Sequence, residues 1–326
     1  MDSNMILDLV RSCIRLTTPI LLAALGATLC NRAGILNFAL EGKMLLGAFL
    51  GITSAYWFSS SPLGMIAAMA SGALLGALFA FLYIRFKVDL VVMAIALNML
   101  ISEMTIFFLR LFFGNVGTWS DPSIQQLPDI QIPLIHDIPI VGQIISGHNI
   151  IVYLSWLATI FIYVLLFHTK FGRHLRAVGE NAAAAETVGI NVARVQLIAL
   201  MITGALAALG GAFLSIGHLT MFTRNISNNR GWVGFSASLF GMSNPAGVFF
   251  ASMLFGSADA IATRIQTITD IPPTLIQFFP NVLTIVALVL VGLRIRGKEV
   301  LARRMFRIKM QKQIAEERAR GEKITL

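Results

Sequence analysis

Long apolar runs with few or no charges recur along the chain, and they constrain its fold more than any other feature. A helix needs about 20 mostly apolar residues to span the hydrocarbon core of a bilayer. Runs of that length cover residues 13–31, 36–58, 63–84, 88–112, 149–167, 195–218 and 274–293. Charged residues make up only 13% of the chain, against about 25% in soluble domains. Lipid is therefore the expected solvent for much of the surface.

A further uncharged run of 28 residues, 231–258, is interrupted at Gly241-Met242-Ser243-Asn244-Pro245, which is a strong signal for a turn or helix break. We expect two shorter helical pieces here, one of them re-entrant, because non-helical backbone at membrane depth must be covered by protein or line a cavity. The sequence thus predicts an all-α, polytopic transmembrane bundle of about eight to ten spans with broken or re-entrant segments.

The placement of Lys and Arg predicts the topology. Residues 113–148 contain neither and are expected outside, whereas residues 168–194 carry four basic residues and are expected in the cytoplasm. Residues 294–326 hold 11 of the 25 Lys and Arg, so the C-terminus is expected in the cytoplasm as well. For these assignments to be consistent, residues 231–264 must begin and end on the same side of the membrane. The N-terminus is then expected outside. We predict a transmembrane domain over 1–295 and a basic cytoplasmic tail over 296–326.

Several other classes of function are disfavoured. The net charge of +9 is concentrated beside a membrane segment, which topology and anionic membrane lipid explain without nucleic acid. Cys13 and Cys30 form no C-x-x-C pair, so no metal site and no cofactor is predicted. Residues 292–298 match G-x-x-x-x-G-K, but Glu299 follows where a phosphate loop needs Ser or Thr. We therefore do not expect an enzyme that hydrolyses ATP.

A polar stretch at residues 30–43 places Arg32, Glu41 and Lys43 between two apolar helices, together with Asn37. It can be a cytoplasmic turn with a solvated charge cluster, which physics alone slightly favours. It can also be a broken helix at membrane depth, with Arg32 paired to Glu41 and Asn37 offered to a polar solute. Charges inside a bilayer are costly and tend to mark function.

Two further stretches are informative. In residues 170–194, Asn181 can cap a short helix over 182–188 that ends at Gly189, which suggests either a docking element for a soluble partner or a plain amphipathic loop. Residues 230–235 lead into the break at 241–245 and suggest an interfacial anchor beside a kinked helix. Glu103 and Arg110 lie two turns apart and can share one helix face.

These three stretches resemble the permease subunits of bacterial ABC importers in the branched-chain amino acid and ribose superfamily, most closely its nucleoside or simple-sugar branch. Residues 32–42 are similar to the pattern E-R-x-G-V/I-I/L-N-I/F-x-L/H-E-G, with Asn31 replacing the usual Glu and Lys43 a common Met. Residues 172–191 resemble a loop G-x-x-x-R-A-V-G-E-N-P-x-A-A-x-x-x-G-I-N/D, with Ala182 replacing Pro. Residues 230–245 resemble R-G-F/Y/W…G-x-x-N/D-P.

The resemblance implies a multi-pass protein of the bacterial inner membrane that acts by alternating access. It implies three partners: an ATP-binding cassette ATPase, a second homologous permease subunit and an extracytoplasmic solute-binding protein. The candidate pathway residues are Arg32, Asn37, Glu41, Asn98, Glu103 and Asn244. The candidate residues of the ATPase-docking loop are Arg176, Gly179, Glu180, Asn181, Ala184, Glu186 and Gly189.

Two alternatives remain open at this point. A permease for branched-chain amino acids would share the same patterns, although few charges in the spans favour an uncharged solute. An autonomous secondary carrier would need ion or proton relays in its spans, where Glu103, Arg110 and residues 32–43 are the few candidates.

Overall fold

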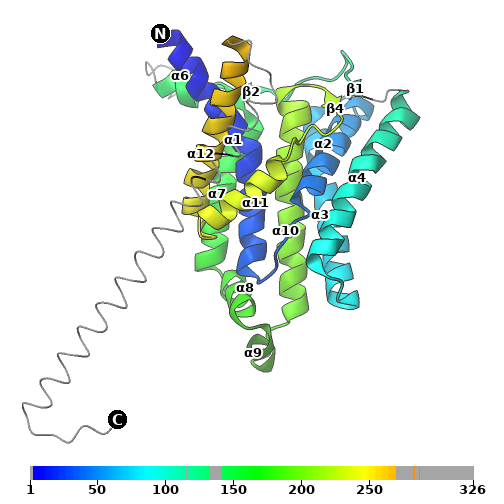
Figure 1. The fold of residues 1–326 in the computed structure, drawn as a ribbon, viewed down its shortest axis with the longest axis vertical. Coiled ribbons are helices and arrows are strands. Elements are labelled where there is room, and N and C mark those ends of the chain that lie inside the picture. Colours follow the sequence, from blue (N-terminus) through cyan, green and yellow to red (C-terminus); the bar gives the residue numbers. More distant parts are fainter. Residues whose placement is uncertain (1–2, 115–116, 132–140, 269–281, 283–285, 287–326) are drawn as a thin grey trace, which may run out of the picture. The chain divides into compact units, whose positions relative to one another are not determined.

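The structure is a computed structural model that describes residues 3–114, 117–131, 141–268, 282 and 286. The chain divides into two compact units, Met1–Pro273 and Thr274–Leu326. Nearly all described residues belong to the first unit, which is a bundle of helices (Figure 1). The predicted span 274–293, apart from residues 282 and 286, and the predicted tail 296–326 lie outside the described residues. The domain boundary at residue 295 therefore stays a prediction.

Six of the described helical segments are long and apolar enough to cross a membrane, which confirms an all-α membrane fold. They are Met5–Arg32, Ser61–Phe86, Leu90–Phe113, Ile150–His168, Val192–His218 and Pro245–Gln266. Helix α2 (Leu40–Trp57) is not one of the six; it has 18 residues and carries Glu41 and Lys43 in its first two turns. The predicted segment 36–58 is thus a shorter helix preceded by an irregular stretch.

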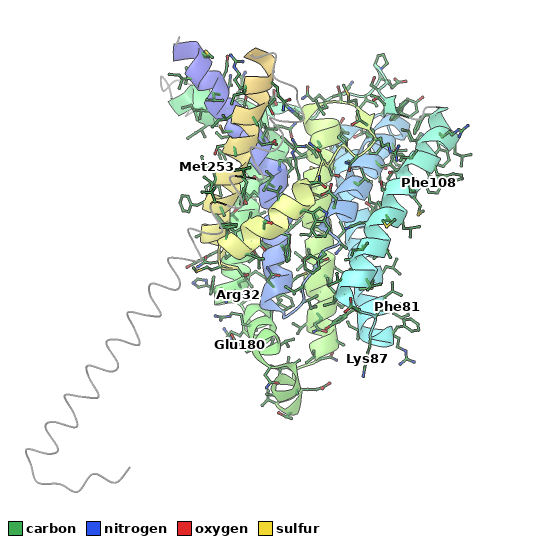
Figure 2. The ribbon with its side chains drawn as sticks, viewed as in Figure 1. Arg32, Phe81, Lys87, Phe108, Glu180 and Met253 are labelled. Atoms are coloured by element: carbon green, nitrogen blue, oxygen red, sulfur yellow. The ribbon has the colours of Figure 1, made fainter. Side chains whose placement is uncertain are left out.

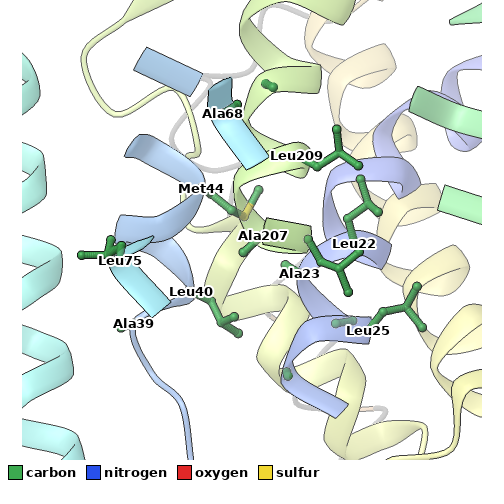
Figure 3. Packing of buried hydrophobic residues seen from close by; sticks show 14 of the residues in the cluster. Leu22, Ala23, Leu25, Ala39, Leu40, Met44, Ala68, Leu75, Ala207 and Leu209 are labelled. Carbon is green, nitrogen blue, oxygen red and sulfur yellow. The ribbon is translucent and has the colours of Figure 1, made fainter. Parts of the chain in front are cut away.

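Helix α1 (Ser3–Arg32) lies in the centre of the bundle, and 83% of its most apolar window is buried. It packs against α10 (Val192–Ala212), α11 (Arg230–Phe240) and α12 (Pro245–Ile268). Figure 3 shows Leu22, Ala23 and Leu25 of α1 near buried residues of α2 and α10. Residues 17–30 of α1 carry no charge and are all buried, as expected of a helix segment with neighbours on every side.

Helix α3 (Ser61–Phe86) packs most extensively against α10 and α2. The contact is close because small residues face each other: a Cβ added at Gly204 would overlap the carbonyl group of Gly72. Small residues let helix backbones approach in lipid, where apolar burial does not drive helices together. Gly72 is therefore a position where α3 and α10 need a small residue.

Helices α3, α4 (Leu90–Phe113) and α7 (Ile150–His168) bound the bundle and expose large apolar side chains. Polar caps fix where several helices begin. The Asp89 carboxylate accepts hydrogen bonds from the backbone N–H of Val91 and Val92, both at 3.0 Å. Asn149 caps α7 in the same way, and Asn191 caps α10.

Short irregular elements close the end of the bundle that carries the predicted external loop. Strand β1 (Thr118–Trp119) pairs with β4 (Phe222–Thr223), and β2 (Asp129–Ile130) pairs with β3 (His148–Asn149), both antiparallel. The short helix α6 (Val141–Ile145) precedes β3. A π-helix, η1 (Phe213–His218), continues α10. None of these elements has a strong hydrophobic period, so the sequence did not reveal them.

The break predicted in residues 231–258 is confirmed. Helix α11 ends at Phe240, α12 begins at Pro245, and Met242 and Ser243 between them have positive φ angles of 53° and 49°. The expectation of two short pieces is only half right, because α11 has 11 residues whereas α12 has 24 and is long enough to span. Figure 1 shows α11 descending to the turn and α12 rising again, as the predicted return requires.

Candidate functional site

The Glu41 carboxylate lies at the N-terminus of α11, inside the bundle. Its Oε1 accepts a hydrogen bond from the Asn229 backbone N–H at 2.9 Å, and its Oε2 accepts one from the Gly231 N–H at 2.8 Å. The N-terminus of a helix offers unpaired N–H groups and the positive end of its dipole, which together stabilise an anion. Glu41 thus joins α2 to α11 while only 9% exposed. There is no space between them for a larger residue, since a Cβ at Gly231 would lie 2.7 Å from Oε2.

Asn98 of α4 forms hydrogen bonds with the first turn of α2 and with the irregular stretch that precedes it. Its Oδ1 accepts a hydrogen bond from the Gly42 N–H at 2.8 Å, and its Nδ2 donates to the Phe38 carbonyl at 3.0 Å. Asn37 is fully buried, and its Oδ1 accepts a hydrogen bond from the Ala39 N–H at 3.1 Å. In this conformation Asn37 therefore shapes the start of α2 and faces the protein interior.

We expect Asn98→Ala to lower the free energy of unfolding by about 1–3 kcal/mol, because it leaves the Gly42 N–H and the Phe38 carbonyl without partners. Thermal unfolding of the purified protein in detergent measures the change. Met99→Ala is the matched control, since Met99 is the next residue on α4 and is 66% exposed. Equal melting temperatures for the two variants would contradict the role of Asn98.

The burial of three polar side chains in the 30–43 stretch does not fit the interpretation that sequence alone slightly favoured. A solvated turn would expose its polar groups, but Asn37 and Lys43 are 0% exposed and Glu41 is nearly buried. Lys43 is also unusual because its Nζ is buried without a hydrogen-bond partner among the described residues and lies 4.8 Å from the centroid of the Phe79 ring. A break between α1 and α2 that protein covers therefore describes this stretch better than a solvated charge cluster.

Arg32 does not join Glu41 as the broken-helix hypothesis suggested; each binds a different partner. The Arg32 Nε donates to the Ser243 carbonyl at 2.8 Å, and its Nη2 donates to the Met242 carbonyl at 3.3 Å. The side chain of Arg32 thus ties the end of α1 to the turn between α11 and α12. Asn244 caps α12 in that turn, where its Oδ1 accepts a hydrogen bond from the Ala246 N–H at 3.2 Å.

Two further ion pairs occur among the described residues. Arg230 lies 2.9 Å from Asp259 and links α11 to α12, with both side chains largely buried. Nothing in the sequence indicated the pairing of Asp259 with Arg230. Glu103, which was expected to share a face with Arg110, lies 3.7 Å from Arg224. The Glu103 and Arg224 side chains are 71% and 64% exposed.

The loop at 170–191 projects from the lower end of the bundle in Figure 1 as α8 (Lys170–Glu180) and α9 (Ala182–Thr187). The predicted helix at 182–188 is confirmed: the Asn181 Oδ1 accepts from the Ala184 N–H at 3.0 Å, and Gly189 has a φ of 84°. Helix α8 was not predicted separately. Most of the candidate docking residues are exposed, namely Glu180, Asn181, Ala184, Glu186 and Gly189.

Gly179 and Arg176 are the two candidate docking residues that are half-buried. Gly179 packs directly on the end of α1, where a Cβ would overlap the Arg32 carbonyl group. Gly34, which has a φ of 75°, also packs against the backbone of Gly179. The projecting loop is therefore in backbone contact with α1, and through Arg32 with the turn between α11 and α12.

These features define a multi-pass helical membrane protein that combines a broken helix pair in its core with a projecting helical loop. Residues 9–288 match the family described as branched-chain amino acid transport system / permease component. The chain belongs to that family, and the resemblance seen in its sequence is confirmed. It is a permease subunit of an ABC transporter, a multi-pass protein of the inner membrane, and is not itself catalytic.

Two curated relatives match most of the chain. The guanosine ABC transporter permease protein NupQ of Bacillus subtilis is 34% identical over 83% of this chain and 87% of its own length. The nucleoside ABC transporter permease protein NupC of Lactococcus lactis is 30% identical over 88% of this chain and 93% of its own length.

A solved structure supports the fold. It is an inward-facing chain of an ABC transporter assigned to the metal-chelate type. The two chains are 19% identical, with a TM-score of 0.50, and the match covers 86% of this chain and 84% of the other. At that identity the likeness concerns the arrangement of helices.

Proposed function

We propose that this chain forms the translocation pathway of an ATP-driven importer for a nucleoside or a simple-sugar-like solute. The observation that carries the proposal is the unbroken path of contacts from the projecting loop, through Gly179 and Arg32, to the turn at Met242 and Ser243. Such a path lets a movement of the loop reach the broken helices in the core. The names of the two relatives support nucleosides as the solute class.

The exposed pair of Glu103 and Arg224 supports a pathway along α4. Glu103 lies near the middle of this apolar helix, and hydrocarbon does not tolerate exposed charges. Water or another protein chain must therefore cover this face of α4. We infer that a second homologous permease subunit faces it, with the solute passing between the two, and that Glu41 and Asn98 hold the helices that border this route.

The partners follow from the two ends of the bundle. A separate ATP-binding cassette ATPase docks on α8 and α9 in the cytoplasm and hydrolyses the ATP, and a solute-binding protein delivers solute at the opposite, external end. The basic residues of 168–194 and 294–326 favour this orientation, with the C-terminus in the cytoplasm. The solute is moved by alternating access and is not changed chemically.

Reconstitution tests the proposal directly. The chain is placed in proteoliposomes with its ATPase, its second permease and its solute-binding protein, and uptake of radiolabelled nucleosides and of ribose is measured with and without ATP. We expect saturable uptake of one of these solutes that requires ATP and the binding protein. Transport by the isolated chain without ATP would instead show an autonomous carrier.

The docking loop provides a second prediction. Glu180→Arg combined with Glu186→Arg reverses two exposed charges on α8 and α9, and we expect roughly tenfold less ATPase to co-purify, as happens when interface residues with large contributions are lost. The control is Lys170→Glu, which reverses an exposed charge at the base of the loop. A charge on a membrane span, as in Leu157→Arg, would be unsuitable because it would face lipid. Unchanged co-purification of the ATPase with the double variant would place the docking surface elsewhere.

A further inference from the structure

A second polar site lies apart from the core contacts of Glu41 and the pair on α4. It is a cavity of about 640 Å³ between the end of α1, one side of α8 and the turn between α11 and α12. The side chains of Arg32, Arg173, Arg176 and Glu180 line it, together with Met242 and Ser243. Figure 2 shows Arg32 and Glu180 near one another at the lower end of the bundle.

The charge of this cavity is strongly positive. Three guanidinium groups and one carboxylate among its lining residues give a formal charge of +2. Arginine is the residue best suited to a phosphate or carboxylate, because its planar fork of N–H donors matches two oxygens at once. A cavity with this lining therefore favours an anion with several oxygens.

Two of the three arginines are held in place before any ligand binds. Arg32 donates to the Ser243 and Met242 carbonyls, at 2.8 and 3.3 Å. The Arg176 guanidinium lies over the Phe167 ring, 5.3 Å from its centroid, and its Nε donates to the Gly172 carbonyl at 3.4 Å. A guanidinium has five N–H donors, so both side chains keep donors free. The Arg173 side chain is exposed and makes no hydrogen bond to a described residue, whereas its backbone N–H donates to the Thr169 carbonyl at 3.3 Å.

We propose that this cavity binds a phosphomonoester of metabolite size from the cytoplasm. A phosphomonoester carries a charge of about −1.5 to −2 at neutral pH, which matches the +2 of the lining, whereas a phospholipid diester carries a smaller charge. The cavity volume falls within the range of about 300–1,000 Å³ that small-molecule pockets occupy. It is larger than a bare phosphate ion needs, which leaves space for the alcohol part of the ester.

A ligand here regulates transport, a consequence that rests on the proposed function. It bridges α8, the end of α1 and the turn between α11 and α12, the three segments through which a movement of the docking loop reaches the broken helices. Occupancy therefore fixes the loop relative to the core and slows ATP-driven uptake. The binding itself needs no transport and is tested separately.

The binding test uses the complete importer complex in nanodiscs of phosphatidylcholine. Equilibrium dialysis with radiolabelled glucose 6-phosphate measures binding, a probe chosen because the ATPase partner binds nucleotides. We expect saturable binding that inorganic phosphate displaces and glucose does not. Arg173→Gln with Arg176→Gln weakens it roughly tenfold or more, the effect of losing hydrogen bonds to a charged group. Lys170→Gln with Arg194→Gln removes two exposed charges of the same loop outside the cavity and leaves binding unchanged.

Three results would overturn the proposal: no saturable binding to the unaltered complex, equal binding by the two double variants, or displacement by glucose. A fourth arm uses nanodiscs that contain phosphatidylglycerol. Selective retention of that lipid by the unaltered protein, with no binding of glucose 6-phosphate, would assign the cavity to a lipid headgroup and also overturn it. If the reconstituted importer shows no ATP-driven uptake in the absence of glucose 6-phosphate, yet the same complex binds glucose 6-phosphate saturably, the proposed function would be contradicted and the ligand site would stand.

Discussion

Replacing Glu41 with alanine is expected to lower the free energy of unfolding by about 3–6 kcal/mol, at about 1.5–3 kcal/mol for each hydrogen bond to the charged carboxylate, and to abolish ATP-driven uptake. The carboxylate accepts two backbone hydrogen bonds at the start of α11, and its loss leaves the Gly231 N–H buried without a partner and the Asn229 N–H without its acceptor. The Asp259 carboxylate does not replace it, because it already accepts a hydrogen bond from Arg230. The N-terminus of α11 would then have no anion to oppose the positive end of its dipole.

Replacing Glu41 with glutamine separates the charge of the side chain from its shape, and the same replacement at Glu186 is the control. Glu41→Gln keeps the size of the side chain but turns one acceptor into a donor that faces an N–H group, so about 1.5–3 kcal/mol is expected to be lost. Glu186→Gln makes the same chemical change on exposed α9 and is expected to leave stability unchanged. Melting temperature in detergent and uptake by proteoliposomes are the readouts. A Glu41→Gln protein as stable as Glu186→Gln would show that the carboxylate is not needed at α11.

The sequence predicted those parts of the fold that depend on local patterns. Apolar length predicted most of the spans, and Gly241 through Pro245 predicted the break because turn residues act within a few positions of themselves. The cap at Asn181 was predictable for the same reason. The start of α1 at Ser3 was not, since polar residues precede the apolar run there.

The pairing of polar groups could not be predicted in the same way, because it depends on segments far apart in the chain. Arg32 and Glu41 are near in sequence, which made a mutual ion pair attractive. Their partners lie about two hundred residues away, in the turn at 242–243 and at the start of α11. Backbone carbonyl and N–H groups satisfy these charges, and a sequence pattern does not display such groups. Asp259 as the partner of Arg230 was missed for the same reason.

Lys43→Met is expected to stabilise the protein by about 1–4 kcal/mol, the range seen when buried charged groups are replaced by apolar residues of similar volume. The Nζ atom of Lys43 is fully buried without a hydrogen-bond partner among the described residues. The cation–π contact between Nζ and the Phe79 ring, 4.8 Å from its centroid, stabilises the charged amine by at most about 2 kcal/mol. Removing an ammonium group from water costs several kcal/mol, so the contact does not offset the burial. Methionine keeps the length of the chain and loses the amine.

The melting temperature in detergent measures this gain, at about 2–4 °C for each kcal/mol. Lys170→Met, on the exposed start of α8, is the matched control and should melt with the unaltered protein. A lower melting temperature for Lys43→Met would mean that the ammonium is compensated in the folded bundle after all. Uptake by the stabilised variant then decides what the lysine does. Retained uptake assigns the buried amine no part in transport, whereas slower uptake by a more stable protein shows that another conformation of the bundle gives the ammonium a partner.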